Sequence, residues 1–392
     1  MAGVSPYVAG RRGLSRLLID DDPTARAPAA VVVPMDAAAV GVGLRGVAGA
    51  LAHRWPAGLA PTPINDPTPD PEAVLPHADY VAITWTAAEA RALANVLTPG
   101  IDPSRWHPYR RNYTTLLPSI RKGAPARAAG RLAGWYRTSI GGKQVLCMKS
   151  ELHLNQDSIA TGDGTATLPV ADLFRQIITE ANPTLIITTG TAGGTLPDAE
   201  LGDVVITRAA RFHLADEFRN EAFNNQTFTS TGNIPTGQLG TATGLLDVAT
   251  GRLREPDFGP PTTRYPFGPL LPGFANTPRL LCDGVDFPAW HPILTTDYFE
   301  FGTSTNRLGD LGCGVEMGDA VLGLVTNQIG AGAPRWLVAR NASDPPINGA
   351  LPTSPTVPDM QAHWALFYYQ QYGYWTSVNS ALACWAVIAA DH

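Results

Sequence analysis

A short stretch of glycine, threonine and alanine could bind a small ligand. Residues 185–187 (LII) form an apolar run that predicts a buried strand, and residues 202–206 (GDVVI) predict the start of a second one. Between them, residues 190–194 (GTAGG) have little side-chain bulk, so backbone N–H groups and the Thr191 hydroxyl can approach a ligand closely. Such turns lie at the carboxyl ends of strands, where open α/β sheets bind ligands. A tight connection that requires glycine is the alternative explanation.

Two carboxylates follow predicted strands and could take part in acid–base chemistry. Glu89 lies in the first turn of a helix predicted over residues 87–97, and Asp344 follows a strand predicted over residues 336–341. An aspartate buried in an apolar cleft has a raised pKa and can donate a proton near neutral pH. Structural explanations also exist: a helix N-terminus stabilises a carboxylate such as Glu89, and Ser-Asp-Pro-Pro at residues 343–346 is typical of a turn.

Five motifs occur in the order found in the purine nucleoside phosphorylase/nucleosidase superfamily, and the chain resembles most its methylthioadenosine/adenosylhomocysteine nucleosidases. They are residues 83–89 with Glu89, residues 189–216 (T-G-[ST]-A-G-G, G-D-[IV]-V and A-R-Y-H-D-A-D), residues 296–299 (G-D-x-F), residues 315–320 ([VD]-[ED]-M-E-x-A) and residues 340–344 (R-x-x-S-D). Leu214 and Gly318 depart from these patterns. The resemblance covers about residues 80–390, interrupted by residues 218–290.

This resemblance implies a fold and an activity. The expected fold class is α/β, a three-layer α/β/α sandwich with a central mixed sheet. The expected reaction is hydrolysis of the N-glycosidic bond of a purine-type nucleoside, which releases free base and sugar and needs no cofactor. Asp344 would protonate the purine N7, and Glu89 would activate the attacking water. Further substrate contacts would come from Thr191, Gly193, Gly194, His213, Phe299, Glu316, Met317, Asp319 and Ser343.

Gly318 puts the sugar site in question. In the resembling family this position is a glutamate that holds the ribose hydroxyls through charge-assisted hydrogen bonds. Either Asp319 or Glu316 replaces that carboxylate, or the sugar is not an ordinary ribose. Asp319 starts a helix predicted over residues 319–328, so capping that helix is an equally good explanation of its presence.

Two other functions stay open at this point. A phosphate-dependent nucleoside phosphorylase could bind phosphate through Thr191 and arginines such as Arg208 or Arg211. However, the chain lacks the Gly-x-Pro-x-Arg loop that phosphorylases of this superfamily have after the first strand. A non-catalytic nucleoside-binding or storage-type protein of the same fold is the other alternative, and the presence of both Glu89 and Asp344 argues against it.

Composition excludes several classes of partner. The 392 residues carry a net charge of −6 and no long basic run, so nucleic-acid binding is not expected. The four cysteines are far apart and predict buried thiols in a reducing compartment. The eight histidines lack metal-binding spacing, so no metal site is expected.

The N-terminus lacks the apolar core of a signal peptide, and the apolar run at residues 381–390 is too short to span a bilayer. We therefore expect a cytoplasmic protein.

The chain divides into two predicted parts. Residues 1–77 form an N-terminal arm, with a helix over residues 37–53 that Asp36 can cap, and residues 78–392 form the nucleoside phosphorylase/nucleosidase-like domain. Helices are predicted over residues 87–97, 169–181, 319–328 and 360–390, a strand over residues 80–84, a hairpin over residues 135–149 and an irregular insertion over residues 218–290. The arm docks either on its own domain or on a neighbouring subunit, and we expect a homo-oligomer.

Overall fold

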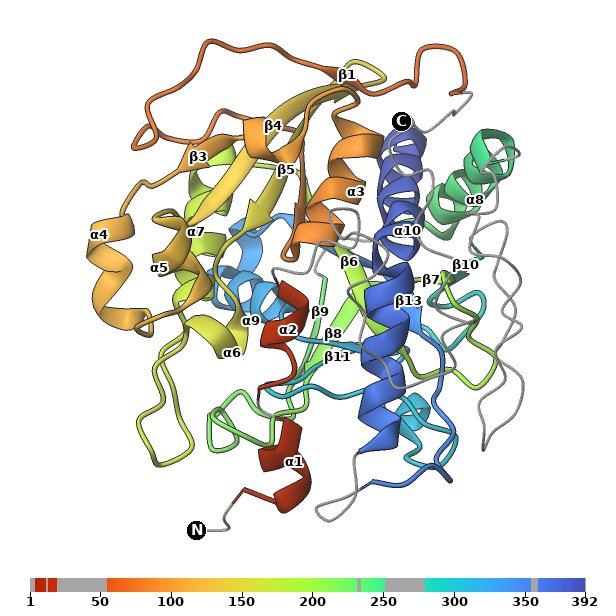
Figure 1. The fold of residues 1–392 in the computed structure, drawn as a ribbon. Coiled ribbons are helices and arrows are strands. Elements are labelled where there is room, and N and C mark those ends of the chain that lie inside the picture. Colours follow the sequence, from red (N-terminus) through yellow and green to blue (C-terminus); the bar gives the residue numbers. More distant parts are fainter. Residues whose placement is uncertain are drawn as a thin grey trace.

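A branched sheet organises the chain. The computed structural model describes residues 4–11, 13–19, 55–230, 234–250, 279–353 and 359–391. The strands are β1 (Thr62–Pro63), β2 (Tyr80–Thr84), β3 (His107–Tyr109), β4 (Ala133–Ile140), β5 (Lys143–Ser150), β6 (Leu185–Gly194), β7 (Val204–Thr207), β8 (Ala209–Phe212), β9 (Thr227–Thr229), β10 (Leu280–Cys282), β11 (Ile293–Thr295), β12 (Gly314–Glu316) and β13 (Arg335–Asp344). The helices are α1 (Pro6–Arg11), α2 (Arg16–Ile19), α3 (Ala87–Leu97), α4 (Tyr113–Leu116), α5 (Pro125–Ala129), α6 (Leu154–Asp157), α7 (Pro169–Ala181), α8 (Thr236–Thr250), α9 (Asp319–Ile329) and α10 (Met360–Ala390) (Figure 1).

The sheet divides at β6. Its main path runs β1-β4-β5-β2-β6-β12-β11-β8-β9, while β13, β7 and β10 continue from β6 as a second branch. The first part of β6 pairs in parallel with β2 and β13, and its last residues pair antiparallel with β12. The ends of β6, β12 and β13 therefore meet where the sheet divides. This meeting point brings residues 191–194, Glu316 and Asp344 together.

Alternating side chains build a core on each face of the sheet. In β2, Val81 and Ile83 pack with residues of α7 and α9, whereas Tyr80 and Ala82 pack with residues of α3, α8 and α10. Figure 1 shows α7 and α9 on one side of the sheet and α3, α8 and α10 on the other. Parallel and antiparallel pairs both occur. The predicted three-layer α/β/α sandwich with a mixed sheet is confirmed.

Local sequence explains where the helices begin and end. α3 starts with a capping box, in which Thr86 Oγ1 accepts from the Glu89 N–H at 3.3 Å and Glu89 Oε2 accepts from the Thr86 N–H at 2.9 Å. Pro169 begins α7, and Asn182 in the left-handed conformation follows its last residue. The Asp359 side chain caps α10. These helices have the predicted bounds, and α9 ends one residue later than predicted.

Residues 218–290 are more regular than predicted. They contain β9, α8 and β10 as well as irregular segments. Leu239, Ala242 and Leu246 of α8 are buried in the same core as α10, so packing outweighs the weak helix propensity of the neighbouring glycines and threonines. Residues 231–233 and 251–278 lie outside the described residues, as does the helix predicted over 37–53 with Asp36. The domain boundary at residue 78 stays a prediction, although β1 pairs with β4 from within the predicted arm.

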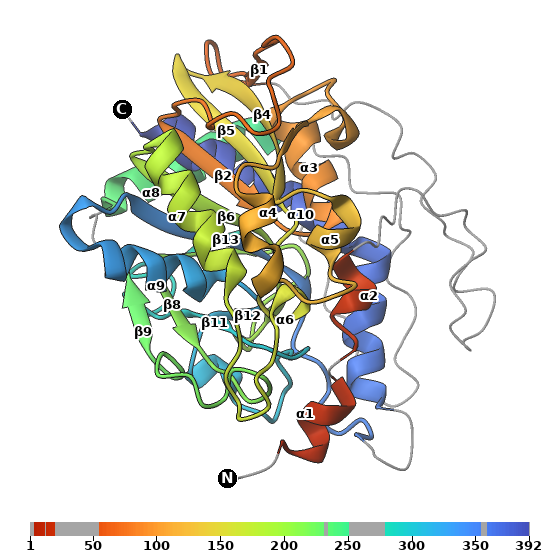
Figure 2. The same cartoon turned by 90° about the vertical axis from the view of Figure 1, so that its left-hand side faces the viewer.

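The N-terminal segment, residues 4–19, packs on its own chain. Figures 1 and 2 both show α1 and α2 beside the first half of α10. Arg11 anchors the segment: its guanidinium lies 3.1 Å from Glu300 Oε1 and 3.0 Å from Asp359 Oδ2. The rings of Tyr7 and Phe301 lie against the same group, with centroids at 3.8 and 4.3 Å. Two carboxylates thus compensate one buried cation, so the described part of the arm docks on its own domain.

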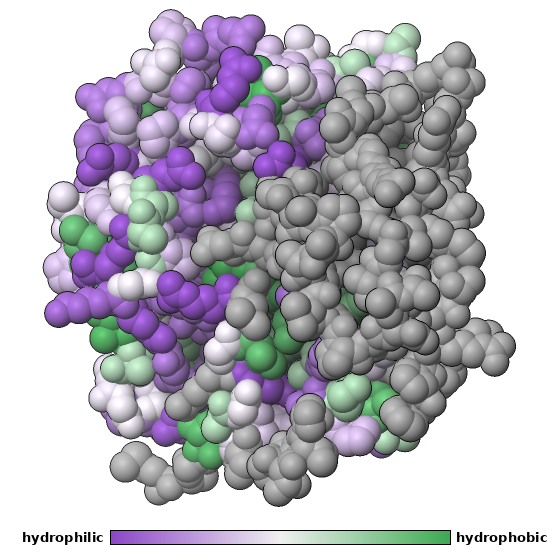
Figure 3. Space-filling model, viewed as in Figure 1, coloured by the Kyte–Doolittle hydropathy of each residue, from purple (hydrophilic) through white to green (hydrophobic). Residues whose placement is uncertain are grey.

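The described surface is mixed in character. Figure 3 shows mainly hydrophilic or intermediate residues on this face, with hydrophobic ones in small separate groups. The four cysteines are buried free thiols, as predicted. Within the described ranges, even the 31-residue α10 is not apolar enough to cross a bilayer. The expected homo-oligomer stays a prediction.

Candidate active site

A pocket lies where β6, β12 and β13 meet. Eight of the residues predicted to contact substrate line it: Glu89, Thr191, Gly193, Phe299, Glu316, Met317, Ser343 and Asp344. They come from five separate segments of the chain, and the branched sheet brings them together. Gly194, His213 and Asp319 are not among the lining residues.

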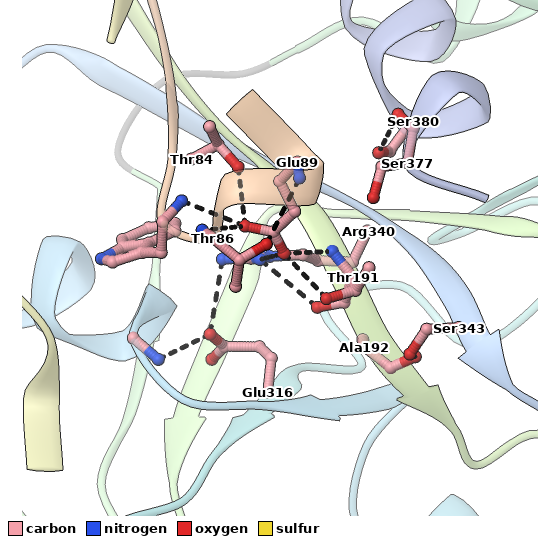
Figure 4. A network of polar contacts seen from close by, with 12 residues as sticks. Thr84, Thr86, Glu89, Thr191, Ala192, Glu316, Arg340, Ser343, Ser377 and Ser380 are labelled. Atoms are coloured by element: carbon pink, nitrogen blue, oxygen red, sulfur yellow. Dashed lines mark hydrogen bonds and ion pairs between the residues drawn. The ribbon is translucent and has the colours of Figure 1, made fainter. Parts of the chain in front are cut away.

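Glu89 is held by donors on both carboxylate oxygens (Figure 4). Its Oε2 accepts from the Thr84 hydroxyl at 2.8 Å and from the N–H groups of Trp85 and Thr86 at 3.0 and 2.9 Å. Its Oε1 accepts from the N–H and the hydroxyl of Thr191, each at 2.7 Å. Burial raises the pKa of Glu89, but the Arg340 charge and the hydrogen bonds from Thr191 and Thr86 outweigh burial, and the pKa lies below its ordinary value. Glu89 is therefore an anion at neutral pH.

Gly190 lets Glu89 approach β6 closely. A Cβ at this position would lie 2.4 Å from Glu89 Oε1, and the glycine has φ of +139°. Any side chain would displace the carboxylate. In the glycine-rich stretch, Gly190 therefore allows the close approach of Glu89, and the backbone N–H of Thr191 binds this carboxylate; the predicted contact of the stretch with a ligand stays a prediction.

Arg340 joins three carboxylates at the base of the pocket. Its Nε and Nη2 lie 2.9 and 2.6 Å from the two oxygens of Asp319, Nη2 lies 3.5 Å from Glu316 Oε2, and Nη1 lies 3.6 Å from Glu89 Oε1. All four side chains are at most 3% exposed. Burial and the neighbouring Asp319 raise the pKa of Glu316. Because three carboxyl groups surround one guanidinium, this carboxylate cluster has negative charge in excess and suits a cation that develops nearby.

Asp344 differs from Glu89 because few donors hold its carboxyl group. It ends β13 after a bulge, and its Oδ1 accepts from the Ser343 hydroxyl at 2.9 Å, whereas the buried Oδ2 has no hydrogen-bond partner among the described residues. A Cβ on Gly193 would lie 3.2 Å from Oδ2, so glycine keeps this oxygen accessible from β6. Burial raises the pKa of Asp344 to about 8. The side chain is therefore mainly protonated at neutral pH and can donate a proton.

Aromatic and apolar side chains form much of the remaining wall. Trp85, Phe299 and Met317 line the pocket, and a flat base could pack between such side chains. The indole of Trp85 lies against Gly318, where a Cβ would be 3.3 Å from Trp85 Cζ2. The Trp85 ring thus lies beside the space that a side chain at position 318 would enter.

Three predicted site residues do not line the pocket, and the structure shows their other contacts. Gly194 is packed so that a Cβ would lie 3.0 Å from the Asp344 carbonyl oxygen. His213 is half-buried, and its backbone N–H donates to the Thr295 carbonyl at 2.8 Å. Burial lowers the pKa of its imidazole ring. Both oxygens of Asp319 bind Arg340, and its side chain makes no capping hydrogen bond on α9. Asp319 lies in the first turn of α9, and its contact with the sugar stays a prediction.

Sequence reasoning missed several lining residues. They are Ser15, Leu18, Ile19, Trp85, Thr86, His153, Asn155, Ala192, Glu300, Val315, Arg340 and Tyr369. Arg340 begins the R-x-x-S-D motif and Trp85 lies in the Glu89 motif, so both could have been found there. The first three come from the N-terminal segment, which has no motif. In the described part of the chain, no group of three His, Cys, Asp or Glu residues is placed to hold a metal ion.

Fold and site together define an α/β protein with a pocket where strand ends meet, equipped for acid–base chemistry. Residues 122–262 match the family model described as the phosphorylase superfamily, so the predicted resemblance of the chain to this superfamily is confirmed. Among curated proteins none matches the sequence.

Solved structures with similar folds are known at low sequence identity. One is a 5′-methylthioadenosine/S-adenosylhomocysteine nucleosidase from Neisseria meningitidis in complex with methylthio-immucillin-A, at 15% identity and a TM-score of 0.44, with 79% of this chain and 99% of that chain covered. Another is the D198N mutant of the corresponding Helicobacter pylori nucleosidase with 5′-methylthioadenosine. Its identity to this chain is 11% and the TM-score is 0.44, with 79% of this chain and 98% of that chain covered. The futalosine hydrolase of Helicobacter pylori matches at 11% identity and a TM-score of 0.43, with 79% of this chain and 96% of that chain covered.

Proposed function

We propose that this protein hydrolyses the N-glycosidic bond of a purine-type nucleoside and releases free base and sugar. The observation that carries the proposal is that one pocket contains both the protonated Asp344, whose Oδ2 has no hydrogen-bond partner among the described residues, and the carboxylate cluster around Arg340. Glycosidic cleavage needs a proton for the leaving group and negative charge near the sugar cation that forms. This pocket has both.

Asp344 supplies the proton in the first step. With its pKa at about 8, about 90% of the carboxyl groups are protonated at pH 7, against roughly 0.1% for an aspartate of ordinary pKa. The proton moves from Asp344 to N7 of the purine as the bond between the base and C1′ breaks. The electron pair of that bond goes to the base, and the sugar becomes an oxocarbenium ion.

The carboxylate cluster acts on the sugar and the water. Glu89 already accepts five hydrogen bonds, so it is a weak base that holds its negative charge in place. Its role is to orient water and stabilise the cation, more than to deprotonate water in advance. Water that adds to a cationic C1′ is strongly acidic, so its proton passes to this cluster and from there to solvent. Solvent then reprotonates Asp344.

The charges in the pocket favour water over phosphate as the attacking group. Arg340 is the lining arginine, and three carboxylates already surround it. Arg208 and Arg211, suggested for phosphate, are not lining residues, and Arg208 is paired with Asp283 at 3.0 Å. A phosphate dianion would meet excess negative charge here. Keeping Asp344 buried and neutral is costly, which argues against a protein that only binds nucleosides.

Product analysis tests the proposal. The full chain is incubated with adenosine, inosine, guanosine and 2′-deoxyadenosine, with and without inorganic phosphate, and free base and sugar are separated by chromatography. We expect base and free sugar at a rate that phosphate does not increase. Formation of sugar 1-phosphate would instead identify a phosphorylase, and binding without base release would identify a binding protein. An Asp344→Asn preparation, purified identically, controls for contaminating hydrolases.

A further inference from the structure

A histidine in the pocket wall has one ring nitrogen that no described residue engages. His153 lines the pocket just before α6 and is 6% exposed. Its Nδ1 lies 3.1 Å from Asp157 Oδ2 and 3.1 Å from the Glu151 carbonyl oxygen. Its Nε2 is buried and without a hydrogen-bond partner in the described structure. Neither the motifs nor the proposed reaction uses this side chain.

The surroundings of His153 determine where its ring hydrogen lies. Both neighbours of Nδ1 are acceptors, so the tautomer that fits them carries its hydrogen on Nδ1 and presents Nε2 as an acceptor. Asp157 is fixed in turn, since its carboxylate also accepts the backbone N–H of His153 at 2.8 Å and that of Ala126 at 3.1 Å. Buried polar atoms are almost always hydrogen-bonded. An unengaged, rigidly held acceptor in a pocket wall therefore indicates a donor on the ligand.

The N-terminal segment adds a donor to the same wall. Ser15 Oγ accepts from Asn155 Nδ2 at 3.2 Å and from Gln156 Nε2 at 2.8 Å. With both lone pairs of the oxygen used, the hydroxyl hydrogen of Ser15 is left to donate. Ser15 and Asn155 line the pocket together with His153. The wall thus presents one acceptor and one donor, which is the complement of a hydroxyl group.

We propose that His153 and Ser15 form a subsite that recognises one hydroxyl of the nucleoside's sugar. This inference rests on the proposed function, because it takes the ligand to be a nucleoside. The sugar hydroxyl donates to His153 Nε2 and accepts from Ser15. A nucleoside without that hydroxyl leaves Nε2 buried and unpaired, and its binding should be weaker by about 10- to 100-fold. His153 and Ser15 are specificity-determining residues, and Asp157 is a positioning residue.

A series of deoxynucleosides tests the subsite. Binding constants from calorimetry and kcat/KM are measured for adenosine and its 2′-, 3′- and 5′-deoxy analogues on the full chain. We expect the wild type to discriminate about 10- to 100-fold against one of the three analogues. His153→Asn keeps a donor near Asp157 but has no group at the Nε2 position, so it should bind adenosine as weakly as that analogue. His153→Gln, whose amide reaches that position, should recover part of the discrimination.

The controls separate this subsite from the proposed activity. His77→Leu changes a histidine outside the pocket, whose Nδ1 binds the Ala181 carbonyl at 2.9 Å, and should leave the discrimination unchanged. If His153→Asn does not fold by thermal melting, Ser15→Ala should still reduce discrimination against the same analogue. Equal binding of all four nucleosides, or discrimination that persists in the variants, overturns the subsite. Discrimination in binding without base release overturns only the proposed hydrolysis, and absence of any binding overturns both.

Discussion

Asp344→Asn is the sharpest test of the proposed acid, because asparagine keeps the shape of the side chain and removes its proton. Burial changes the protonated fraction at pH 7 from roughly 0.1% to about 90%, a factor of about 10³ that corresponds to about 4 kcal/mol. A general acid typically contributes about 10²- to 10⁴-fold. We therefore expect kcat to fall by about 10²- to 10⁴-fold.

The pH dependence of kcat/KM also tests whether Asp344 acts as the acid. Since the protonated form is active, kcat/KM of the wild type should decline about tenfold per pH unit above a pKa of about 8, and this decline should be missing in Asp344→Asn.

The raised pKa of Asp344 also predicts how the stability of the fold depends on pH. The folded-state pKa lies above the unfolded value, so the stabilisation is full below about pH 3.9 and is lost as pH rises to about 8. Asparagine does not ionise, so the Tm advantage of the variant should grow over that interval and then level off.

The assay is base release, followed by chromatography from pH 5 to pH 10, with Tm measured in the same buffers. Turnover of Asp344→Asn near the wild-type value would refute the acid assignment. So would a wild-type profile that stays flat beyond pH 9, since Asp344 would then be ionised in the active enzyme.

Three further changes have defined expected outcomes. Ser343→Ala removes a hydrogen bond that favours ionised Asp344, so the alkaline decline of kcat/KM should move to higher pH. Gly190→Ala places a Cβ 2.4 Å from Glu89 Oε1 at a φ of +139°, so base release should fall at least about tenfold and stability by about 1–3 kcal/mol. Arg11→Met leaves two carboxylates without their buried cation, and the loosened N-terminal segment should raise KM about tenfold with a smaller effect on kcat.

Matched variants separate these effects from general damage. Gly142→Ala also has positive φ, +82°, but open space around it, so it reports backbone strain without contact with a carboxylate. Arg307→Met breaks an exposed pair with Asp310 and should leave KM unchanged. Activity of Gly190→Ala equal to that of Gly142→Ala would contradict the close-approach argument. A KM for Arg11→Met no higher than that of Arg307→Met would show that the N-terminal segment does not shape the pocket.

The regular elements could be predicted because their signals are local. The Thr86–Glu89 capping box, Pro169 at the start of α7 and the cap at Asp359 are all contained in a few neighbouring residues. The helix α8 within residues 218–290 was missed because it has no local signal. It packs against α10, which lies more than 100 positions away in the chain.

The candidate site was predicted where a motif carries the residue, and missed where only tertiary packing does. Glu89 and Asp344 stand in motifs, and both line the pocket. Asp319 was predicted to contact the sugar because of its position beside Gly318, whereas its pairing with Arg340, 21 positions later, could not be predicted from neighbouring residues. His153 and Ser15 have no motif, and only the fold places them in the same wall.

The anchoring of the N-terminal segment has a consequence for how the protein is made. Arg11 and Asp359 are 348 positions apart in the chain. At about 5–20 residues per second, synthesis of the intervening chain takes roughly 20 to 70 s. During that time Arg11 has no Asp359 to bind, and β6 has no β13 to pair with until 141 further residues have been added after its last residue. The wall that contains Ser15 can therefore close only after translation has passed the start of α10, so a ribosome-bound intermediate would have Glu89 and Thr191 but no completed pocket.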